Sequence, residues 1–333
     1  MPITIDGSNG ITQAGEFNSD SSFGFKNRII NGAMVIDQRN AGASVTNVGS
    51  ASTYTLDRWF YFASQASKFT VQQDAGAVTP PVGFNDYLGI TSSSAYTVGS
   101  SEIFLLAQHI EGFNVADLNW GTANAKTVTL SFWVRSSLTG TFGGSLRNAD
   151  SNRSYPFTYS ISSSNTWEQK TITVAGDTSG TWGTGNGTGI RLTFGLGMGS
   201  SFSGTAGSWS GNNFISATGA TSVVGTNGAT FYITGVQLEV GSTATSFDYR
   251  PYTTELQLCQ RYYAFGGNSF FGSYGGSSSG VIMLFYKVSM RATPTITSTL
   301  AGSSGSGVST EVGNIYIPTN STSPTTWTAS AEL

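Results

Sequence analysis

The chain has 333 residues, a length that predicts two domains and is ample for a buried core. Charged residues make up only 10% of it, against roughly 25% in an average soluble domain, and the net charge of −3 excludes a basic surface for nucleic acid. No apolar run approaches the ~20 residues of a membrane-spanning helix, so we expect no membrane insertion.

Cys259 is the only cysteine, which excludes an intramolecular disulfide framework. A surface of Ser, Thr, Asn and Gly is typical of extracellular adhesive proteins. The N-terminus has no basic region followed by an apolar stretch, however, so we expect no signal peptide and folding in a cytosol. A virion component, made in a host cytoplasm and released by lysis, satisfies both conditions. Composition therefore favours localisation in a virion.

Strong helix formers are scarce and β-branched, aromatic and Gly residues abound, which predicts an all-β fold. Over residues 127–135, apolar side chains face one way, while Trp133 and Arg135 face the other. Similar patterns predict strands at 68–73, 87–91, 102–110, 140–146, 154–161, 167–174, 190–196 and 231–240. Turn-forming clusters separate these strands, and no strand–helix alternation appears. We therefore expect a jelly-roll-like antiparallel β-sandwich over residues 25–250.

Residues 251–265 form the clearest helical segment, because Glu255 suits a first helical turn and Leu256, Cys259 and Tyr263 lie on one stripe. Expected strands at 281–288, 294–299 and 314–317 follow it. This linking helix and a smaller β domain would occupy residues 251–333. Residues 1–24 are too poor in apolar side chains for a core of their own, which predicts an N-terminal arm or virion attachment segment.

Several segments resemble a recurrent bacteriophage tail-fibre family: NRIINGAMVIDQRN (27–40), YTLDRWF (54–60), the run 107–144, RSYPFTY (153–159), the run 166–182, ATFYITGVQLEVGS (229–242), YRPYTTELQLCQRYY (249–263) and FYKVSMRATPTIT (285–297). The resemblance covers roughly residues 25–300. It implies a jelly-roll domain like that of carbohydrate-binding modules, in a homotrimeric fibre that recognises host surface polysaccharide. Residues 1–24 and 301–333 lie outside it, and we expect the N-terminal arm to contact other phage tail or capsid proteins.

Aromatic side chains are the best positive signal for function. The C–H faces of sugars stack on Trp and Tyr rings, while Arg and amide side chains bind the hydroxyl groups. Trp133 and Arg135 leave the polar face of their strand, and Trp182 and Trp209 lie in long Gly/Ser-rich loops. Tyr155 is the first ring of the alternating aromatic residues in RSYPFTY (153–159). For each ring alone, packing in a core or a trimer interface is the alternative. The hypothesis of a carbohydrate site therefore concerns the set.

Catalysis is not expected. His109 is the only histidine, so we expect a packing residue and no nucleophilic triad. The acidic residues are isolated, although spacing alone does not exclude a glycosidase pair. A structural calcium ion is the remaining cofactor, for which Asp57, Glu239 or Asp248 would supply oxygen ligands without a recognisable calcium loop.

Three alternatives to a receptor-binding fibre stay open. The first is a structural capsid-decorating or baseplate fibre without receptor activity. The second is a polysaccharide-degrading enzyme, and the third is a secreted bacterial adhesin, against which the missing signal peptide argues.

Overall fold

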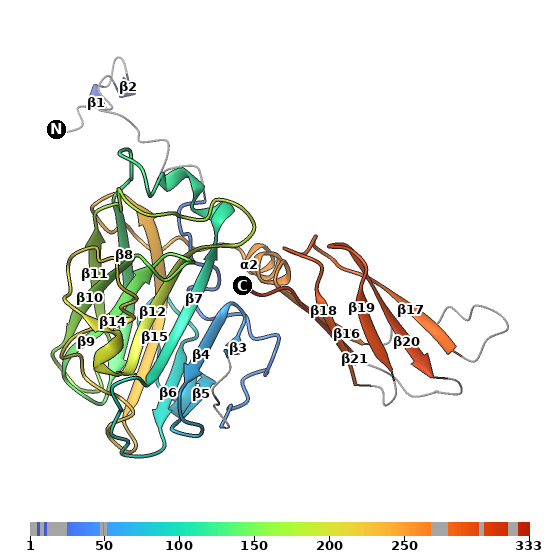
Figure 1. Cartoon of the computed structure of the whole chain (residues 1–333), viewed down its shortest axis with the longest axis horizontal. Coiled ribbons are helices and arrows are strands. Elements are labelled where there is room, and N and C mark those ends of the chain that lie inside the picture. The colour runs from blue at the N-terminus through green and yellow to red at the C-terminus, as the bar shows by residue number, and fades with distance from the viewer. Residues whose placement is uncertain are drawn as a thin grey trace.

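The alternating pattern folds into an antiparallel β-sandwich, followed by one helix and a smaller β module (Figure 1). The computed structural model describes residues 5–6, 10–11, 25–46, 49, 52–267, 279–299, 303–318 and 326–333. Within these ranges, no helix has the length and apolar character needed to cross a membrane. The prediction of an all-β, jelly-roll-like fold is confirmed.

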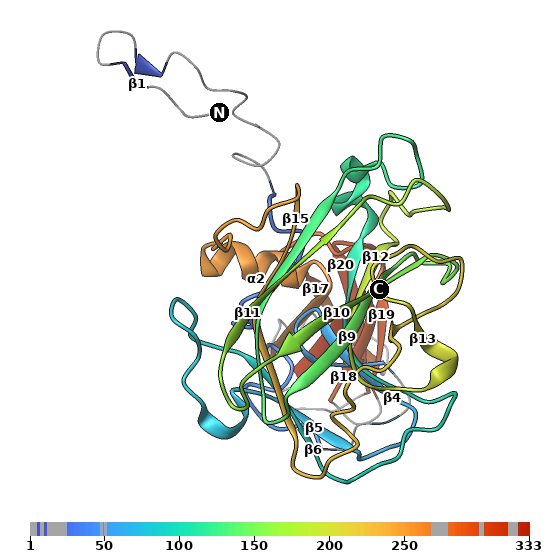
Figure 2. The same ribbon diagram turned by 90° about the vertical axis from the view of Figure 1, so that its left-hand side faces the viewer.

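Two antiparallel sheets form the sandwich. One consists of β3 (Thr53–Leu56), β4 (Trp59–Ala63), β7 (Ile103–Glu111), β9 (Gly140–Arg147), β10 (Ser154–Ile161) and β12 (Thr188–Met198), in the order β10-β9-β12-β7-β4-β3. The other consists of β5 (Phe69–Gln73), β6 (Leu88–Ser92), β8 (Val128–Ser136), β11 (Glu168–Val174) and β15 (Thr230–Val240), in the order β11-β8-β15-β6-β5. Figure 2 views the molecule from the sandwich side, with the smaller module behind it.

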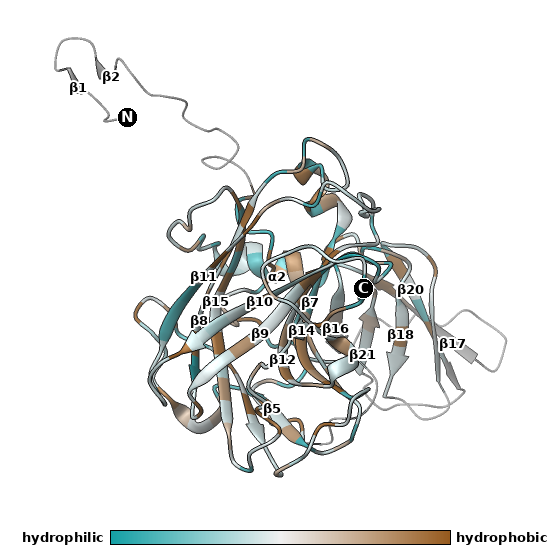
Figure 3. Ribbon diagram, turned by 60° about the vertical axis from the view of Figure 1, so that its left-hand side comes forward, coloured by the Kyte–Doolittle hydropathy of each residue, from teal (hydrophilic) through white to brown (hydrophobic). Residues whose placement is uncertain are grey.

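Apolar side chains from both sheets meet between them. Phe132 of β8 and Phe194 of β12 are fully buried and pack edge-on, with 5.0 Å between their ring centroids. Trp59 is also fully buried, and its indole nitrogen donates to the carbonyl of Asn31 at 3.0 Å, so the one polar group of this side chain is paired. The edge strand β11, in contrast, is largely hydrophilic (Figure 3). Burial of the apolar side chains between the two sheets is the main stabilising contribution to the sandwich.

Strands β3 and β4 were not among the expected ones. They are joined by a tight turn in which Arg58 adopts a positive φ of 70°. β4 has apolar residues on both faces. Phe60 lies on the outer face of the sheet, where it packs against Leu105 and Ile215. The short parallel pair β13 (Ser203–Gly204) and β14 (Ser216–Ala217) belongs to the loop that carries Ile215. The usual alternation that marks a strand is therefore lost in β4.

The helix is shorter than predicted. It ends at Gln260 (α2, Tyr252–Gln260), and Tyr263–Gly267 forms strand β16, so the prediction that residues 251–265 are all helical is wrong. Aromatic residues favour extended backbone here, two glycines disfavour helix, and Tyr263 pairs with Ser330 across the sheet. On the helix itself, Cys259 is fully buried.

The C-terminal module contains two small sheets. Strands β16, β18 (Thr295–Ser298) and β21 (Thr326–Ser330) have the order β16-β21-β18, and β17 (Ser279–Phe285), β19 (Ser304–Gly307) and β20 (Val312–Pro318) have the order β17-β20-β19. Leu284, Ile315 and Trp327 are buried in its core. The arm predicted for residues 1–24 lies outside the described residues, except for the pair β1 (Ile5–Asp6) and β2 (Gly10–Ile11).

Buried ion pairs join the module to the sandwich. The chain returns from β21 to a place beside α2 and β7 (Figure 1), where Glu332 pairs with Arg39 at 2.6 Å and with Arg58. At the end of β7, Glu111 accepts two hydrogen bonds from Arg261, at 2.6 and 3.0 Å. These contacts fix α2 and the C-terminal segment against the sandwich.

Candidate functional site

The outer face of the five-stranded sheet carries aromatic side chains. Trp133 and Arg135 leave β8 on the side opposite the core residues and are half-buried. Arg135 lies 5.5 Å from the ring centroid of Tyr232, its cross-strand partner on β15. Tyr232 in turn contacts Tyr87, and Tyr87 contacts Trp167, at centroid distances of 5.2 and 5.5 Å. Rings from four segments thus pack together on this face, where Trp133 and Trp167 are partly exposed while Tyr87 and Tyr232 are buried beneath them, 0% and 4% exposed.

A bulge in β15 extends this surface. The register of β15 against β8 shifts between Thr234 and Gln237, and Gly235 adopts a positive φ of 61°. A Cβ atom at Gly235 would lie 2.6 Å from Phe84 Cζ and 3.1 Å from Trp133 Cδ1. Only glycine therefore allows both rings to lie against the backbone here.

Phe84, Phe247 and Tyr249 form a triad of rings beside this bulge. Their centroids are 5.1 Å apart for Phe84–Phe247, 5.6 Å for Phe84–Tyr249 and 4.9 Å for Phe247–Tyr249. The hydroxyl of Tyr249 donates to the carbonyl of Gly83 at 2.7 Å, yet 57% of Tyr249 is exposed. We call the triad, together with Trp133, Tyr232, Tyr87 and Trp167, the aromatic face.

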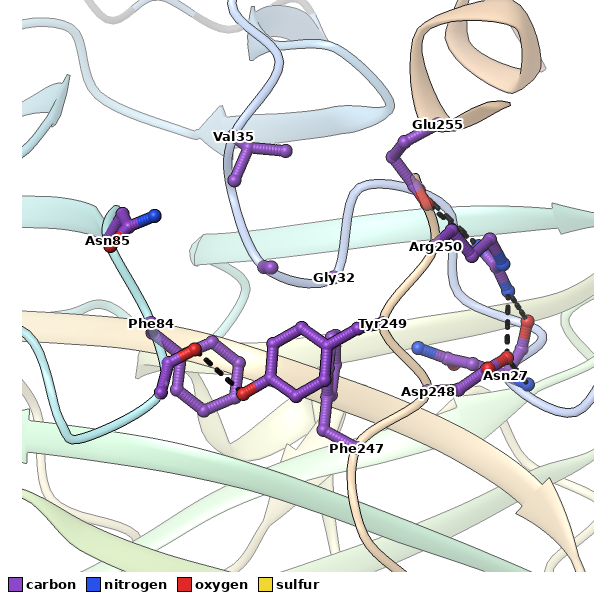
Figure 4. A pocket seen from close by; sticks show the side chains of 12 residues that line it. Asn27, Gly32, Val35, Phe84, Asn85, Phe247, Asp248, Tyr249, Arg250 and Glu255 are labelled. Carbon is purple, nitrogen blue, oxygen red and sulfur yellow. Dashed lines mark hydrogen bonds and ion pairs between the residues drawn. The ribbon is translucent and has the colours of Figure 1, made fainter. Parts of the chain in front are cut away.

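A pocket of about 170 Å³ opens beside the triad, where the sandwich meets α2 (Figure 4). The loops around Gly32 and Phe84, the segment 247–250, Asn27 and Glu255 line this junction pocket. Drug-sized ligands occupy pockets of about 300–1,000 Å³. The junction pocket is therefore of a size to receive one ring of a longer ligand.

Most polar groups in the junction pocket already have protein partners. Arg250 pairs with Glu255 at 3.2 Å, and the amide of Asn27 donates to the carbonyl of Val236 at 3.0 Å. Asp248 accepts the backbone N–H of Asn27 through Oδ2 at 3.2 Å. The described residues offer no partner to Oδ1 of Asp248 or to the exposed side chain of Asn85. These two groups are open to a ligand.

Two carboxylates share a hydrogen bond beneath Tyr87. Asp74 accepts the backbone N–H of Tyr87 at 3.0 Å, and its side chain is hydrogen-bonded to that of Asp86. Burial and the neighbouring Asp74 carboxylate raise the pKa of Asp86 to about 6, and burial raises the pKa of Asp74. The folded protein therefore holds a proton in this pair at a higher pH than the unfolded chain does.

This proton makes stability depend on pH. A carboxyl group whose pKa is raised by folding stabilises the folded state at low pH. This stabilisation is complete below the pKa of the unfolded chain, about 4, and is lost as the pH rises through the folded pKa of about 6. We expect Asp86→Asn to have a higher melting temperature than the wild type at pH 7.5, by roughly 2–4 °C, and a much smaller advantage at pH 4. Thermal unfolding at the two pH values measures this, and an equal shift at both would contradict the shared proton.

The bulge gives a second prediction. Gly235→Ala should weaken binding at the aromatic face by displacing Phe84 and Trp133, and should cost roughly 1–2 kcal/mol in stability through its positive φ. Gly241→Ala is the matched control, because Gly241 also has a positive φ, of 117°, but a Cβ there meets no atom within 4 Å. Chemical denaturation and ligand titration of both variants separate strain from ring displacement.

A second aromatic cluster contains three of the side chains singled out in the sequence. Tyr155, Trp182 and Trp209 come together around Trp120, with centroid distances of 4.7 Å for Trp120–Trp182 and 5.2 Å for Tyr155–Trp209. Trp120 and Trp182 are only 7% and 9% exposed. The three indole nitrogens donate to backbone carbonyls. The cluster packs loops together and offers less open ring surface than Tyr249 does.

The structure thus divides the five sequence candidates between two places. Trp133 and Arg135 lie on the aromatic face of the five-stranded sheet, whereas Tyr155, Trp182 and Trp209 form the loop cluster. Sequence reasoning missed the ring triad because its members lie in loops without periodicity. The available signal was the run FDYR at 247–250, in which aromatic and charged residues alternate just before the helix.

The candidate metal ligands have protein partners. Asp57 accepts the backbone and side-chain N–H groups of Gln38 at 2.7 and 2.6 Å, and burial raises the pKa of Asp57 to about 6. Glu239 accepts two hydrogen bonds from Thr245, at 2.9 and 2.6 Å. In the part of the chain that the structure describes, no group of three or more His, Cys, Asp or Glu side chains is arranged to hold a metal ion. A calcium ion held by Asp57, Glu239 or Asp248 stays a prediction.

No protein-family model and no curated protein matches the chain. Solved structures resemble it distantly. The enzymatically active domain of tailspike protein 4 of bacteriophage CBA120 is 13% identical over 65% of this chain and 21% of that one, with a TM-score of 0.36. This chain thus spans about a fifth of that tailspike domain.

Two other solved structures are similar over their own whole length. A putative sugar binding protein from Bacteroides thetaiotaomicron is 13% identical over 65% of this chain and 100% of that one, with a TM-score of 0.37. A CBM4 module is 15% identical over 63% and 98%, with a TM-score of 0.32. Likeness at this distance assigns no function to the chain.

Proposed function

We propose that the chain is a non-catalytic glycan-binding protein whose binding surface is the aromatic face with the junction pocket. The observation that carries the proposal is the exposed ring of Tyr249, held beside Phe84 and Phe247 and next to the free groups of Asn85 and Asp248. Aromatic rings supply stacking surfaces for sugar C–H groups, and amide and carboxylate groups bind the hydroxyls. The junction pocket would receive one sugar ring, while the exposed ring of Tyr249 and the partly exposed rings of Trp133 and Trp167 stack on its neighbours.

The acidic residues at this surface are engaged in contacts with the protein. Glu255 and Asp248 line the junction pocket, where Glu255 pairs with Arg250 at 3.2 Å and Asp248 accepts the backbone N–H of Asn27. A glycosidase holds two carboxyl groups roughly 5–9.5 Å apart, so that the scissile bond and water fit between them. Asp74 and Asp86, near Tyr87, instead interact directly with each other. Their second role is to position Tyr87, whose backbone N–H donates to Asp74.

We place this activity in a bacteriophage tail fibre that adheres to host surface polysaccharide. The sequence resemblance to the tail-fibre family and the low charge of the chain support this placement. One shallow sugar site binds weakly, whereas three sites in a homotrimer raise avidity by ~10²-fold or more. In this proposal residues 1–24 attach the fibre to other phage tail or capsid proteins.

Binding to cells tests the proposal. The purified full-length protein is titrated onto intact candidate host cells before and after their surface polysaccharide is removed. Saturable binding that disappears with the polysaccharide would support glycan adhesion. Binding that survives its removal, or none to any host of the parent phage, would overturn it in favour of a structural fibre.

A further inference from the structure

Basic side chains lie side by side on the outer face of the six-stranded sheet. Arg147 on β9 pairs directly with Arg191 on β12, and Arg191 pairs with His109 on β7. The neighbouring residues Leu146, Leu192 and Ile110 point into the core, so all three basic side chains share the outer face. Directly paired residues have Cβ atoms about 4.5–5.5 Å apart. We call Arg147, Arg191 and His109 the basic row.

The two arginines of the basic row lack acidic partners, unlike most others in the chain. Ion pairs with Asp or Glu are formed by Arg28, Arg39, Arg58, Arg153, Arg250 and Arg261. Neither Arg147 nor Arg191 forms one with any described residue. Arg147 donates through Nη1 to Asn213 at 2.7 Å, and Arg191 through Nη1 to Ser151 at 2.7 Å.

Burial makes this arrangement costly for the fold. Arg147 is only 6% exposed, and the Nε atoms of both Arg147 and Arg191 are buried without a hydrogen-bond partner. Unsatisfied buried donors and like charges on paired strands both destabilise a sheet. A ligand that accepts hydrogen bonds from both guanidinium groups would offset this cost.

The row stays positively charged at neutral pH. Burial and the charge of Arg191 lower the pKa of Arg147 only to about 10, so its guanidinium remains protonated. Burial, with the charge of Arg191, lowers the pKa of His109 to about 3, so the imidazole is neutral. The acidic group that influences Arg191 is the exposed Asp150, which forms no ion pair with it. The charge at the row therefore comes from the two arginines.

We propose that the basic row binds the carboxylate or sulfate group of an acidic glycan. Planar guanidinium groups match the geometry of such oxyanions, and bidentate contacts of this kind are among the strong hydrogen bonds. Each arginine keeps an Nη2 donor that no described acceptor uses, whereas its Nε atom is buried. Arg191 is partly exposed and gives the ligand access from solvent, while its cross-strand neighbour Arg147 is 6% exposed. The site lies on the sheet opposite the aromatic face and does not depend on it.

Calorimetric titration of the full-length protein at constant ionic strength tests this proposal. The probes are tetrasaccharides of hyaluronan, chondroitin sulfate and polygalacturonate, a neutral chitin tetrasaccharide, and inorganic sulfate. We expect at least one acidic tetrasaccharide to bind at least tenfold more tightly than the neutral one and than inorganic sulfate. Absence of this preference for all three acidic probes would overturn the proposal. Sulfate binding as tight as the best tetrasaccharide would overturn the glycan assignment.

Variants then locate the site. Arg191→Gln and Arg147→Gln should each weaken binding of the acidic tetrasaccharide at least tenfold. Arg191→Lys keeps the charge but not the planar guanidinium group, so it should weaken binding by a smaller factor. Lys170→Gln removes one charge from a surface pair with Glu168 and should bind like the wild type. Arg191→Gln also relieves the repulsion, so its melting temperature without ligand should not fall. Unchanged binding by Arg191→Gln would contradict the site, whatever happens to neutral glycans at the aromatic face.

Discussion

Replacing Glu332 with Gln should lower the free energy of unfolding by about 3–5 kcal/mol, because the change breaks a buried ion-pair network. Glu332 is the common counter-ion of Arg39, at 2.6 Å, and of Arg58, whose side chain is 1% exposed. Arg58 is held in place by the ring of Tyr262, 3.6 Å below its guanidinium carbon, and cannot move out to water. Urea denaturation followed by intrinsic fluorescence measures the loss.

Glu311→Gln is the matched control for this variant. Glu311 belongs to the same C-terminal module but is exposed and forms no ion pair with the described residues. Its replacement should change the free energy of unfolding by less than about 0.5 kcal/mol. If both variants lost the same amount of stability, the buried network would not be what joins the module to the sandwich.

Replacing Tyr249 with Ala should weaken glycan binding about tenfold or more, or at least ~1.4 kcal/mol. Tyr249 is the most exposed ring of the triad and borders the junction pocket, so its loss removes stacking surface directly. Its single hydrogen bond, to the carbonyl of Gly83, lies at the surface, and stability should change little. Titration of the best glycan into wild type and variant measures the effect.

Tyr316→Ala controls for the loss of an exposed tyrosine. Tyr316 lies on β20 of the C-terminal module and is 45% exposed, far in the fold from the junction pocket. This variant should bind glycan like the wild type. Equal loss in both variants would indicate a nonspecific effect of removing surface aromatic residues, and would contradict the proposed site.

The sandwich could be predicted where burial is one-sided. Strand β8 alternates regularly, so its core residues and the outward position of Trp133 followed from the sequence. Strand β4 could not be recognised, because Phe60 and its neighbours are apolar on both faces of the sheet. The predicted helix was too long because the local sequence pattern does not reveal that Tyr263 pairs with Ser330, 67 residues further along the chain.

The candidate site was only partly predictable for a related reason. Outward-facing Trp133 was found, but the ring triad is assembled from Phe84 and the segment 247–250, which meet only in the fold. Gly235, which lets Phe84 approach the sheet, is unremarkable in a chain with 43 glycines. The pairing of Arg147 with Arg191 likewise depends on strand register, which the sequence alone did not supply.

Hydroxyl-radical footprinting of the full-length protein, with and without bound glycan, tests the central claim most directly. The account predicts that bound glycan protects Tyr249 and Phe84 from oxidation, while Trp209 of the loop cluster reacts at an unchanged rate. Protection of Trp209 with Tyr249 and Phe84 unaffected would contradict the account and move the glycan site to the loop cluster.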